Sequence, residues 1–314
     1  MSFKHLPYSM QNSEQGRGKP SPYYTRSGVF VYSRGWACPC PARGRPYIKL
    51  CFLACLFLLL LVACDAPSVT VNGTPVTSSA QATATALNVW NNAGTGVQVR
   101  YEDWKSPAGD DDTVTIVRFD LHHITLSVGY QPNQPMLLSK WMQQEKATAI
   151  INGGYFDAQD NATALVVSNG QASGQSYQGF GGMLSVNDQG AISLRSLHQQ
   201  PYDPNSEQLE QATQSSPMLV LNGKRTQFNA DASMTPRSVV ATDKQGRLLF
   251  IVSPGQVFSL DELADQLVAS DLSINNALNL DGGASTGLYV NAGNQHVAID
   301  SSAMLPIVII VRAK

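Results

Sequence analysis

Residues Ala277–Thr286 read ALNLDGGAST, and residues Ala149–Asp157 read AIINGGYFD. In each segment an apolar stretch typical of a buried β-strand runs directly into a Gly-Gly pair flanked by polar residues. Glycine permits positive φ and close backbone approach, so N–H groups at such a turn can point at an anion or a sugar oxygen. Loops at strand ends often carry functional residues. Both segments are therefore candidate site loops, although either one taken alone is also compatible with a simple tight turn.

Short strand patterns separated by turn residues extend to both sides of these segments. The expected strands are Thr113–Phe119, Ile124–Val128, Ala147–Ile151, Met218–Leu221, Ser238–Ala241, Leu248–Val252 and Leu305–Val311. Asn222-Gly223 is a strong signal for a two-residue hairpin turn, and Asp243–Gly246 predicts another hairpin. His122 and His123 are expected in the middle of a strand, on opposite faces, and receive no functional role.

Helices are fewer than strands. Met136–Lys146 carries apolar residues at helical spacing, and Ser259–Ala269 does so more clearly. Ser259 can cap the second helix, because Glu262 stands three residues later as in a capping box. The sequence thus predicts an α+β fold: a single domain dominated by mixed or antiparallel sheet, with two or three helices.

The N-terminal part contains an export signal. Leu50–Ala63 reads LCFLACLFLLLLVA and follows several basic residues. This apolar run is shorter than the ~20 residues that a spanning helix needs, and it matches the apolar region of a signal peptide. Leu61–Cys64 resembles a bacterial lipobox, which implies cleavage before Cys64 and lipid on that cysteine. A short transmembrane anchor is the alternative, and both interpretations place the domain outside the cytoplasm.

These patterns divide the chain into four parts. Residues 1–42 stay unassigned and are expected to be a disordered leader, and residues 43–63 form the signal peptide. Residues 64–95, rich in Thr, Ser, Ala and Asn, are expected to be a lipid-anchored flexible linker. Residues 96–314 form the globular domain, which is long enough to bury a proper core. The expected location is the extracytoplasmic face of the cell membrane.

Cysteine and charge are distributed unevenly along the 314 residues. All five cysteines lie at or before Cys64, which excludes a disulfide framework, a cysteine nucleophile and a thiolate metal site in the globular part. Eight of the 21 basic residues but only one of the 23 acidic residues precede Cys64. The remainder has 13 basic against 22 acidic residues, a net charge of −9. Nucleic acid is therefore not an expected partner, because it requires a basic face.

In this order and spacing the motifs resemble the phosphodiester glycosidase family. The segments that carry the resemblance are Ala149–Asp157, Gln214–Gly223, Pro236–Ala241 with the Gly246–Val252 strand, Phe258–Leu267, and Ala277–Thr286. It covers nearly the whole domain, from about Val114 to the C-terminus. The resemblance implies hydrolysis of a sugar-1-phosphodiester at the anomeric carbon, which would release sugar and a phosphomonoester from envelope or exopolysaccharide glycans.

The resemblance also implies site residues. Asp281, Arg237 and Asn152 are the expected catalytic residues: a carboxylate that acts as base or nucleophile, a fork donor to phosphate, and a side chain that orients substrate oxygens. The expected substrate-binding residues are Gly153, Gly154, Asp157, Gly282, Gly283, Ser285 and Thr286. An Asx-turn role for Asp157 is equally open. Tyr155 and Phe156 are expected to pack in the core, with sugar stacking by Tyr155 as the minor alternative.

No cofactor and no metal site are expected, and a divalent cation requirement is left open. The expected partners are a carbohydrate phosphodiester and the membrane, which the chain would reach through its N-terminal lipid; the oligomeric state is left open. The alternative function is that of a non-catalytic glycan-binding surface lipoprotein with the same fold. Fold resemblance does not distinguish the two functions.

Overall fold

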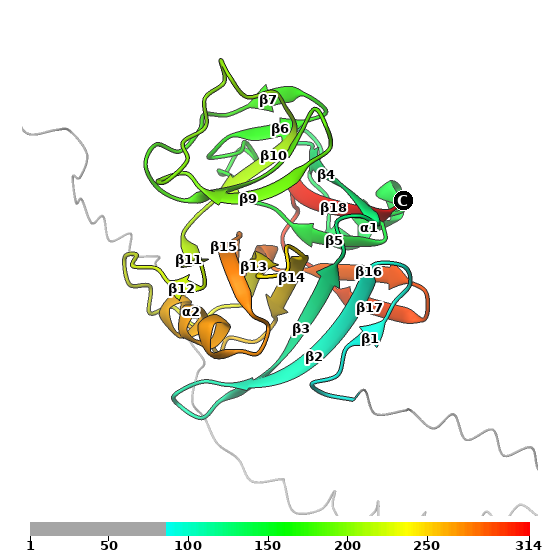
Figure 1. Cartoon of the computed structure of the whole chain (residues 1–314), viewed down its shortest axis with the longest axis vertical. Coiled ribbons are helices and arrows are strands. Elements are labelled where there is room, and N and C mark those ends of the chain that lie inside the picture. The colour runs from blue at the N-terminus through cyan, green and yellow to red at the C-terminus, as the bar shows by residue number, and fades with distance from the viewer. Residues whose placement is uncertain (1–85) are drawn as a thin grey trace, which may run out of the picture. The chain divides into compact units, whose positions relative to one another are not determined.

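Three antiparallel β-sheets, two α-helices and a short 3-10 helix make up residues 86–314, the part of the chain that the computed structural model describes (Figure 1). The predicted α+β, sheet-dominated single domain is confirmed. Every strand pairing in this part of the chain is antiparallel, as adjacent hairpins favour. The predicted leader, signal peptide and Cys64 lie outside the described residues.

The elements have the following bounds and order. The eight-stranded sheet runs β1 (Asn91–Asn92), β2 (Val97–Lys105), β3 (Asp111–Phe119), β14 (Leu248–Ser253), β13 (Arg237–Asp243), β15 (Ile274–Asn279), β11 (Met218–Leu221), β12 (Lys224–Arg225). A five-stranded sheet runs β17 (Gln295–Ile299), β16 (Leu288–Ala292), β5 (Ala149–Asn152), β18 (Ile307–Ala313), β4 (Ile124–Tyr130). The other runs β7 (Gln171–Ser173), β6 (Val166–Ser168), β10 (Leu209–Ser215), β8 (Gly182–Asn187), β9 (Ile192–Ser196). The helices are α1 (Leu138–Glu145), α2 (Leu260–Ala269) and the 3-10 helix η1 (Gly283–Ser285).

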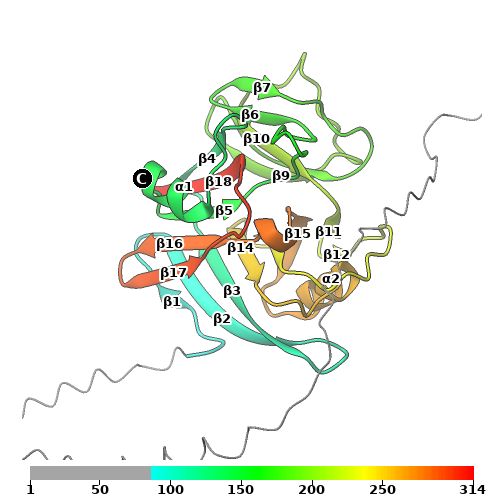
Figure 2. The same ribbon diagram turned by 180° about the vertical axis from the view of Figure 1, so that it is seen from behind.

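The sheets are packed on both faces, because alternate side chains of a strand point to opposite sides. In β14, Leu248, Phe250 and Val252 join the central core, which the eight-stranded sheet shares with β5, β16 and β18. Leu249 and Ile251 point the other way and pack with the apolar face of α2. β5 and β18 alternate likewise between the central core and α1. Figure 2 shows α1 beside β5 and β18, and α2 beside β11 and β12.

Helix α2 begins as its sequence predicts. The Ser259 hydroxyl accepts a hydrogen bond from the Glu262 N–H at 3.3 Å, and the Glu262 carboxylate accepts one from the Ser259 N–H at 2.9 Å. This capping box satisfies two N–H groups that would otherwise lack partners, and such a cap stabilises a helix by about 1 kcal/mol. The fixed start of α2 also fixes the Phe258 carbonyl, which contacts the candidate site.

The hairpin at Asn222-Gly223 is confirmed, while two other predictions need correction. Asn222 and Gly223 both have positive φ, 52° and 73°, as a tight two-residue hairpin requires. His122 and His123 were expected within a strand but lie exposed in the turn between β3 and β4. The sheet also begins inside the stretch 64–95 that was expected to be linker, because β1 pairs with β2.

The eight-stranded sheet and the five-stranded sheet that contains β5 share one core, and this packing brings the ends of β5 and β15 together. Both strands share the central core, through Ile151 on β5 and Leu278 on β15. The Gly-Gly pairs follow directly, at Gly153-Gly154 after β5 and at Gly282-Gly283 after β15. The two loops that the sequence marks as candidates therefore meet in space although about 130 residues separate them.

Candidate active site

Asn152 joins the two Gly-Gly loops. It is 1 % exposed, and its side-chain amide donates a hydrogen bond of 2.7 Å to the carbonyl oxygen of Asp281. Its side-chain oxygen accepts from the Gly287 N–H at 3.3 Å, and the Asp281 N–H donates to the Gly153 carbonyl at 3.1 Å. Asn152 thus holds the backbone of Asp281 in place through its amide nitrogen. Its amide oxygen is occupied by the Gly287 N–H.

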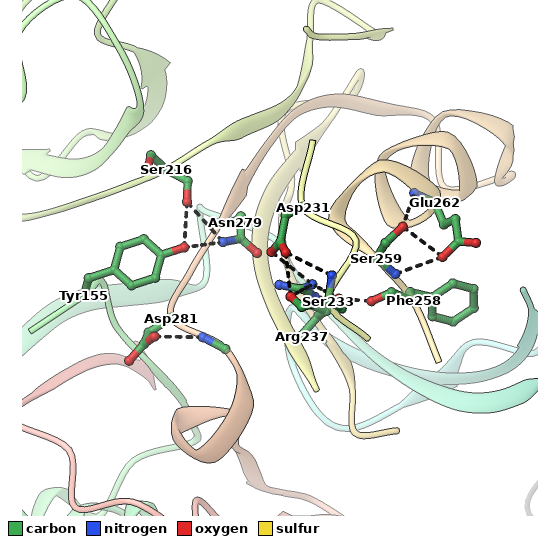
Figure 3. A network of polar contacts seen from close by, with 11 residues as sticks. Tyr155, Ser216, Asp231, Ser233, Arg237, Phe258, Ser259, Glu262, Asn279 and Asp281 are labelled. Atoms are coloured by element: carbon green, nitrogen blue, oxygen red, sulfur yellow. Dashed lines mark hydrogen bonds and ion pairs between the residues drawn. The ribbon is translucent and has the colours of Figure 1, made fainter. Parts of the chain in front are cut away.

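The Asp281 carboxylate is partly buried at the start of its loop, where Oδ1 accepts a hydrogen bond of 2.9 Å from the Gly282 N–H (Figure 3). Burial raises the pKa of the Asp281 carboxyl above its ordinary value, because the charged form loses hydration. Hydrogen bonds from the Ser285 side chain and the Gly282 N–H offset part of that rise. The result is a carboxylate of increased basicity, a property that suits a base or a nucleophile.

Arg237, the first residue of β13, is buried with its guanidinium beside the Asp281 loop. Its Nη2 donates to the Ser233 carbonyl at 2.5 Å and lies 3.4 Å from an Asp231 carboxylate oxygen. Its Nε donates to the Phe258 carbonyl at 3.4 Å. Nη1 makes no hydrogen bond within residues 86–314, and it lies 4.0 Å from the point where a Cβ on Gly282 would stand. One donor nitrogen of Arg237 therefore remains without a partner on the side of Gly282, while Figure 3 shows the guanidinium beside Asp231, Ser233 and Phe258.

Tyr155 contributes a hydroxyl group that the sequence analysis did not use. The hydroxyl donates to the Ser216 carbonyl at 2.8 Å and accepts from the Asn279 side-chain amide at 2.7 Å (Figure 3). Burial, together with the negative charge of Asp281, raises the pKa of Tyr155 to about 12. Tyr155 is thus not a pure core residue, as had been expected, because its polar end joins the network. Tyr155 and Asn279 both stand in the two Gly-Gly motifs, because Tyr155 follows the first Gly-Gly pair and Asn279 precedes the second.

The four glycines act mainly through packing and local hydrogen bonds. The Gly153 and Gly283 N–H groups donate to the carbonyls of Ile307 and Pro236, so neither is available to an anion as the sequence analysis expected. The Gly282 N–H is taken by Asp281, which leaves the Gly154 N–H without a partner within the described part of the chain. A Cβ on Gly154 would stand 2.2 Å from the Gln214 carbonyl, so only glycine fits there.

Unpaired oxygens border the same place. Ser285 and Thr286 are buried in and just after η1, and the Thr286 hydroxyl has no hydrogen-bond partner among residues 86–314. The same holds for the side-chain oxygens of Thr213, Ser215 and Asn279. Buried polar atoms are normally paired, so these four unpaired oxygens, in or beside β10, β15 and η1, are exceptions among the described residues.

Asp157 is not part of this network, because its carboxylate bonds within its own turn. Its carboxylate accepts hydrogen bonds of 2.9 Å from the N–H groups of Asn161 and Gln159, which form an Asx turn. Those bonds, led by that of Asn161, hold the pKa of the exposed Asp157 carboxyl below its ordinary value. Of the two roles that the sequence left open, the turn role is the one the geometry displays.

A pocket of about 650 Å³ adjoins the network at Ser216. Within residues 86–314 no group of three or more His, Cys, Asp or Glu side chains is placed to hold a metal ion. No helix in this range is long and apolar enough to cross a membrane. The site assembled so far is a carboxylate, an arginine and a tyrosine around a glycine-rich loop.

Comparison with known proteins identifies a family and two similar folds. Residues 145–311 match the phosphodiester glycosidase family. In structure the chain is similar to the catalytic domain of zebrafish N-acetylglucosamine-1-phosphodiester alpha-N-acetylglucosaminidase, auto-inhibited by its pro-peptide, with 19% identity and a TM-score of 0.55 over 69% of this chain and 83% of that one. It is also similar to a hypothetical protein from Synechocystis, with 16% identity and a TM-score of 0.52 over 70% of this chain and 62% of that one. No curated protein matches the chain in sequence.

Proposed function

The chain belongs to the phosphodiester glycosidase family, and on that premise we propose that it is a hydrolase that cleaves the glycosidic bond of sugar-1-phosphodiesters. The substrates are envelope or exopolysaccharide glycans outside the cytoplasm. The observation that carries the proposal is that Asp281 and the free Nη1 of Arg237 flank the same residue, Gly282. A basic carboxylate beside a cation suits attack at a carbon whose leaving group is an anion.

The reaction breaks the bond between the anomeric carbon and the phosphate oxygen. Water supplies the hydroxyl of the free sugar and one proton, and the phosphate departs as a phosphomonoester. The departing phosphomonoester anion is already a good leaving group, so the demand for a general acid is low. Positioning and charge stabilisation then provide most of the rate enhancement.

Each residue has one role in this scheme. Asp281 acts at the anomeric carbon, either as the nucleophile or as the base that deprotonates the attacking water. Arg237 directs Nη1 to a phosphate oxygen, and its other nitrogens are held by the 231–233 segment and by Phe258. Asn152 is a positioning residue, because it contacts the backbone of Asp281 and leaves no amide atom for the substrate.

The proposed location, the extracytoplasmic face of the membrane, rests on the N-terminal sequence. A signal peptide at 43–63 and lipid on Cys64 would tether the domain to the extracytoplasmic face of the membrane, with the linker giving it reach. A protein tethered there meets cell-envelope and exopolysaccharide phosphodiesters. The net charge of −9 beyond the signal peptide leaves substrate anions dependent on local cations such as Arg237.

A second candidate is a non-catalytic glycan-binding lipoprotein with this fold. The observation in its favour is that Arg237 is already bonded by Ser233, Asp231 and Phe258, so only part of its fork is free for phosphate. Such a protein would retain a saturable glycan site and show no turnover.

The deciding experiment measures release of free sugar from a panel of α- and β-linked sugar-1-phosphodiesters by the purified full-length chain. Asp281→Asn and Arg237→Lys are assayed beside it, with circular dichroism to verify folding. We expect turnover that Asp281→Asn lowers by ~10²–10⁴-fold. Saturable binding of envelope glycan with no turnover of any panel member would instead establish the binding protein.

A further inference from the structure

The pocket of about 650 Å³ begins at a residue of the candidate site. Ser216 lines the pocket, and its carbonyl oxygen also receives the hydrogen bonds of Tyr155 and Asn279. The next two residues, Pro217 and Met218, continue the lining. The pocket therefore borders the polar network of the site at Ser216.

One wall of the pocket is attached to Tyr155. Phe180 lines the pocket and stacks on Tyr177 with ring centroids 4.5 Å apart. The Thr163 hydroxyl lies 3.5 Å from the Tyr177 hydroxyl and donates to the Tyr155 carbonyl at 3.2 Å. An aromatic pair thus leads from Tyr155 to the pocket mouth.

A second part of the lining belongs to the segment that bonds Arg237. Phe228 and Asn229 line the pocket, and two residues later the same segment supplies Asp231 and then Ser233, which bond the guanidinium. Phe228 is held in turn by the Arg225 guanidinium, 5.4 Å from the ring centroid. The alcohol attached to a phosphate at Arg237 can extend along this segment toward the pocket.

The pocket lining is predominantly apolar. Phe180, Pro217, Met218, Leu221, Phe228 and Leu260 contribute to it, and none of the lining residues is Lys, Arg, Asp or Glu. Phe180 is 52% exposed, although large apolar side chains are usually covered. Apolar side chains left uncovered around a pocket mark a binding site for an apolar group.

We infer that this pocket holds the alcohol esterified to the phosphate, and that this alcohol is apolar: a hydrocarbon chain or an aryl group. The inference rests on the proposed function and specifies its substrate class. The sugar then lies toward Asp281, and the phosphate lies at Arg237. Water adds to the anomeric carbon, the bond from that carbon to the phosphate oxygen breaks, and the products are free sugar and an alkyl or aryl phosphate. A second sugar is the competing occupant, because Gln227 and Asn229 also line the pocket.

The test uses three esters of each sugar 1-phosphate in the panel, with methyl, octyl and glucosyl alcohols, at concentrations below micelle formation. The purified full-length chain is assayed for free sugar, and kcat/KM is compared. Each buried methylene is worth about fourfold in binding, so burying three or four of them favours octyl over methyl on the order of 100-fold. Phe180→Ala lowers the octyl-to-methyl ratio, because it removes one wall of the pocket. Val268→Ala, at an exposed position of α2 outside the pocket, leaves the ratio unchanged.

Each other outcome overturns the inference. Equal kcat/KM for octyl and methyl esters shows that the pocket does not take the alcohol, and the proposed hydrolase remains. Preference for the glucosyl ester shows a glycan in the pocket. No turnover of any ester removes the proposed function, and the inference with it.

Discussion

The side-chain amide of Asn152 lies 2.7 Å from the carbonyl oxygen of Asp281, a hydrogen bond that spans 129 residues of sequence. It crosses from the end of β5 to the loop after β15, so it ties two different sheets together at the site. The position of the Asp281 carboxylate therefore depends on this hydrogen bond to its own backbone carbonyl.

Replacing Asn152 by Asp tests this link. At neutral pH a carboxylate oxygen would face the Asp281 carbonyl, so we expect a loss of roughly 3 kcal/mol in the free energy of unfolding. The buried carboxyl would have a raised pKa, and its protonated form could donate the missing hydrogen bond. The deficit relative to wild type should therefore shrink as the pH falls. Asn152→Ala is the control, because it cannot recover at low pH. Urea unfolding at several pH values measures both, and an equal deficit at all pH values would contradict the link.

Asp281→Asn should raise the melting temperature at neutral pH while it lowers turnover by ~10²–10⁴-fold. Because burial raises the pKa of this carboxyl in the folded state, the folded protein binds a proton more readily than the unfolded chain, and stability falls as the pH rises through the interval from about 3.8 to the raised value. The asparagine variant avoids this cost. Its advantage should disappear as the pH falls below 3.8, where the carboxyl is protonated in both the folded and the unfolded wild type. Calorimetry across pH checks this, and an advantage that grows toward low pH would refute it.

The pH profile of turnover should reflect the same carboxyl. Whether Asp281 acts as base or as nucleophile, its ionised form is the active one, so kcat/KM should rise with pH along an acidic limb. The midpoint of that limb should lie above the ordinary aspartate value, because burial raises the pKa of Asp281. A pH–rate profile on any ester that the enzyme turns over measures the midpoint. A midpoint at or below the ordinary value would argue that Asp281 is not the group observed.

Tyr155→Phe should cost about 1 kcal/mol of stability, because it removes the hydroxyl that bridges Ser216 and Asn279. For a domain of this size that is a fall in melting temperature of about 2–4 °C. Tyr101→Phe is a matched control, since the Tyr101 hydroxyl makes no hydrogen bond within residues 86–314. Thermal melts of both variants decide the matter, and equal losses would show that the bridge contributes nothing.

Two glycine variants separate packing from backbone conformation. Gly154→Ala would place a Cβ 2.2 Å from the Gln214 carbonyl, so β10 or the loop must move, at a cost of roughly 1–3 kcal/mol or more. Gly283→Ala meets no atom within 4 Å, but its φ of 58° is left-handed, which costs about 1–2 kcal/mol. Urea unfolding should rank Gly154→Ala as the more damaging. The reverse order would mean that the loop after β5 is free to relax.

Local pattern predicted much of the fold. The spacing of Ser259 and Glu262 placed a capping box that the structure contains, because both bonds form within one turn of helix. Asn222-Gly223 predicted a hairpin turn for a similar reason, since two adjacent residues with positive φ suffice. His122 and His123 were assigned to a strand although the predicted strands end at Phe119 and resume at Ile124, and they lie in the turn between β3 and β4.

The sequence by itself determined the family, the fold class and the two Gly-Gly loops, since these depend on strand and turn signals a few residues long. Only the tertiary structure decided which groups are free to act. The N–H groups of Gly153 and Gly283 are occupied by carbonyls of distant residues, and Arg237 keeps one donor beside Gly282. The Tyr155 hydroxyl becomes part of the site only because packing brings Ser216 and Asn279 within hydrogen-bond distance of it. The physical reason is that a hydrogen-bonding group is satisfied or left free by partners that the packing of two sheets supplies, and no short stretch of sequence contains that packing.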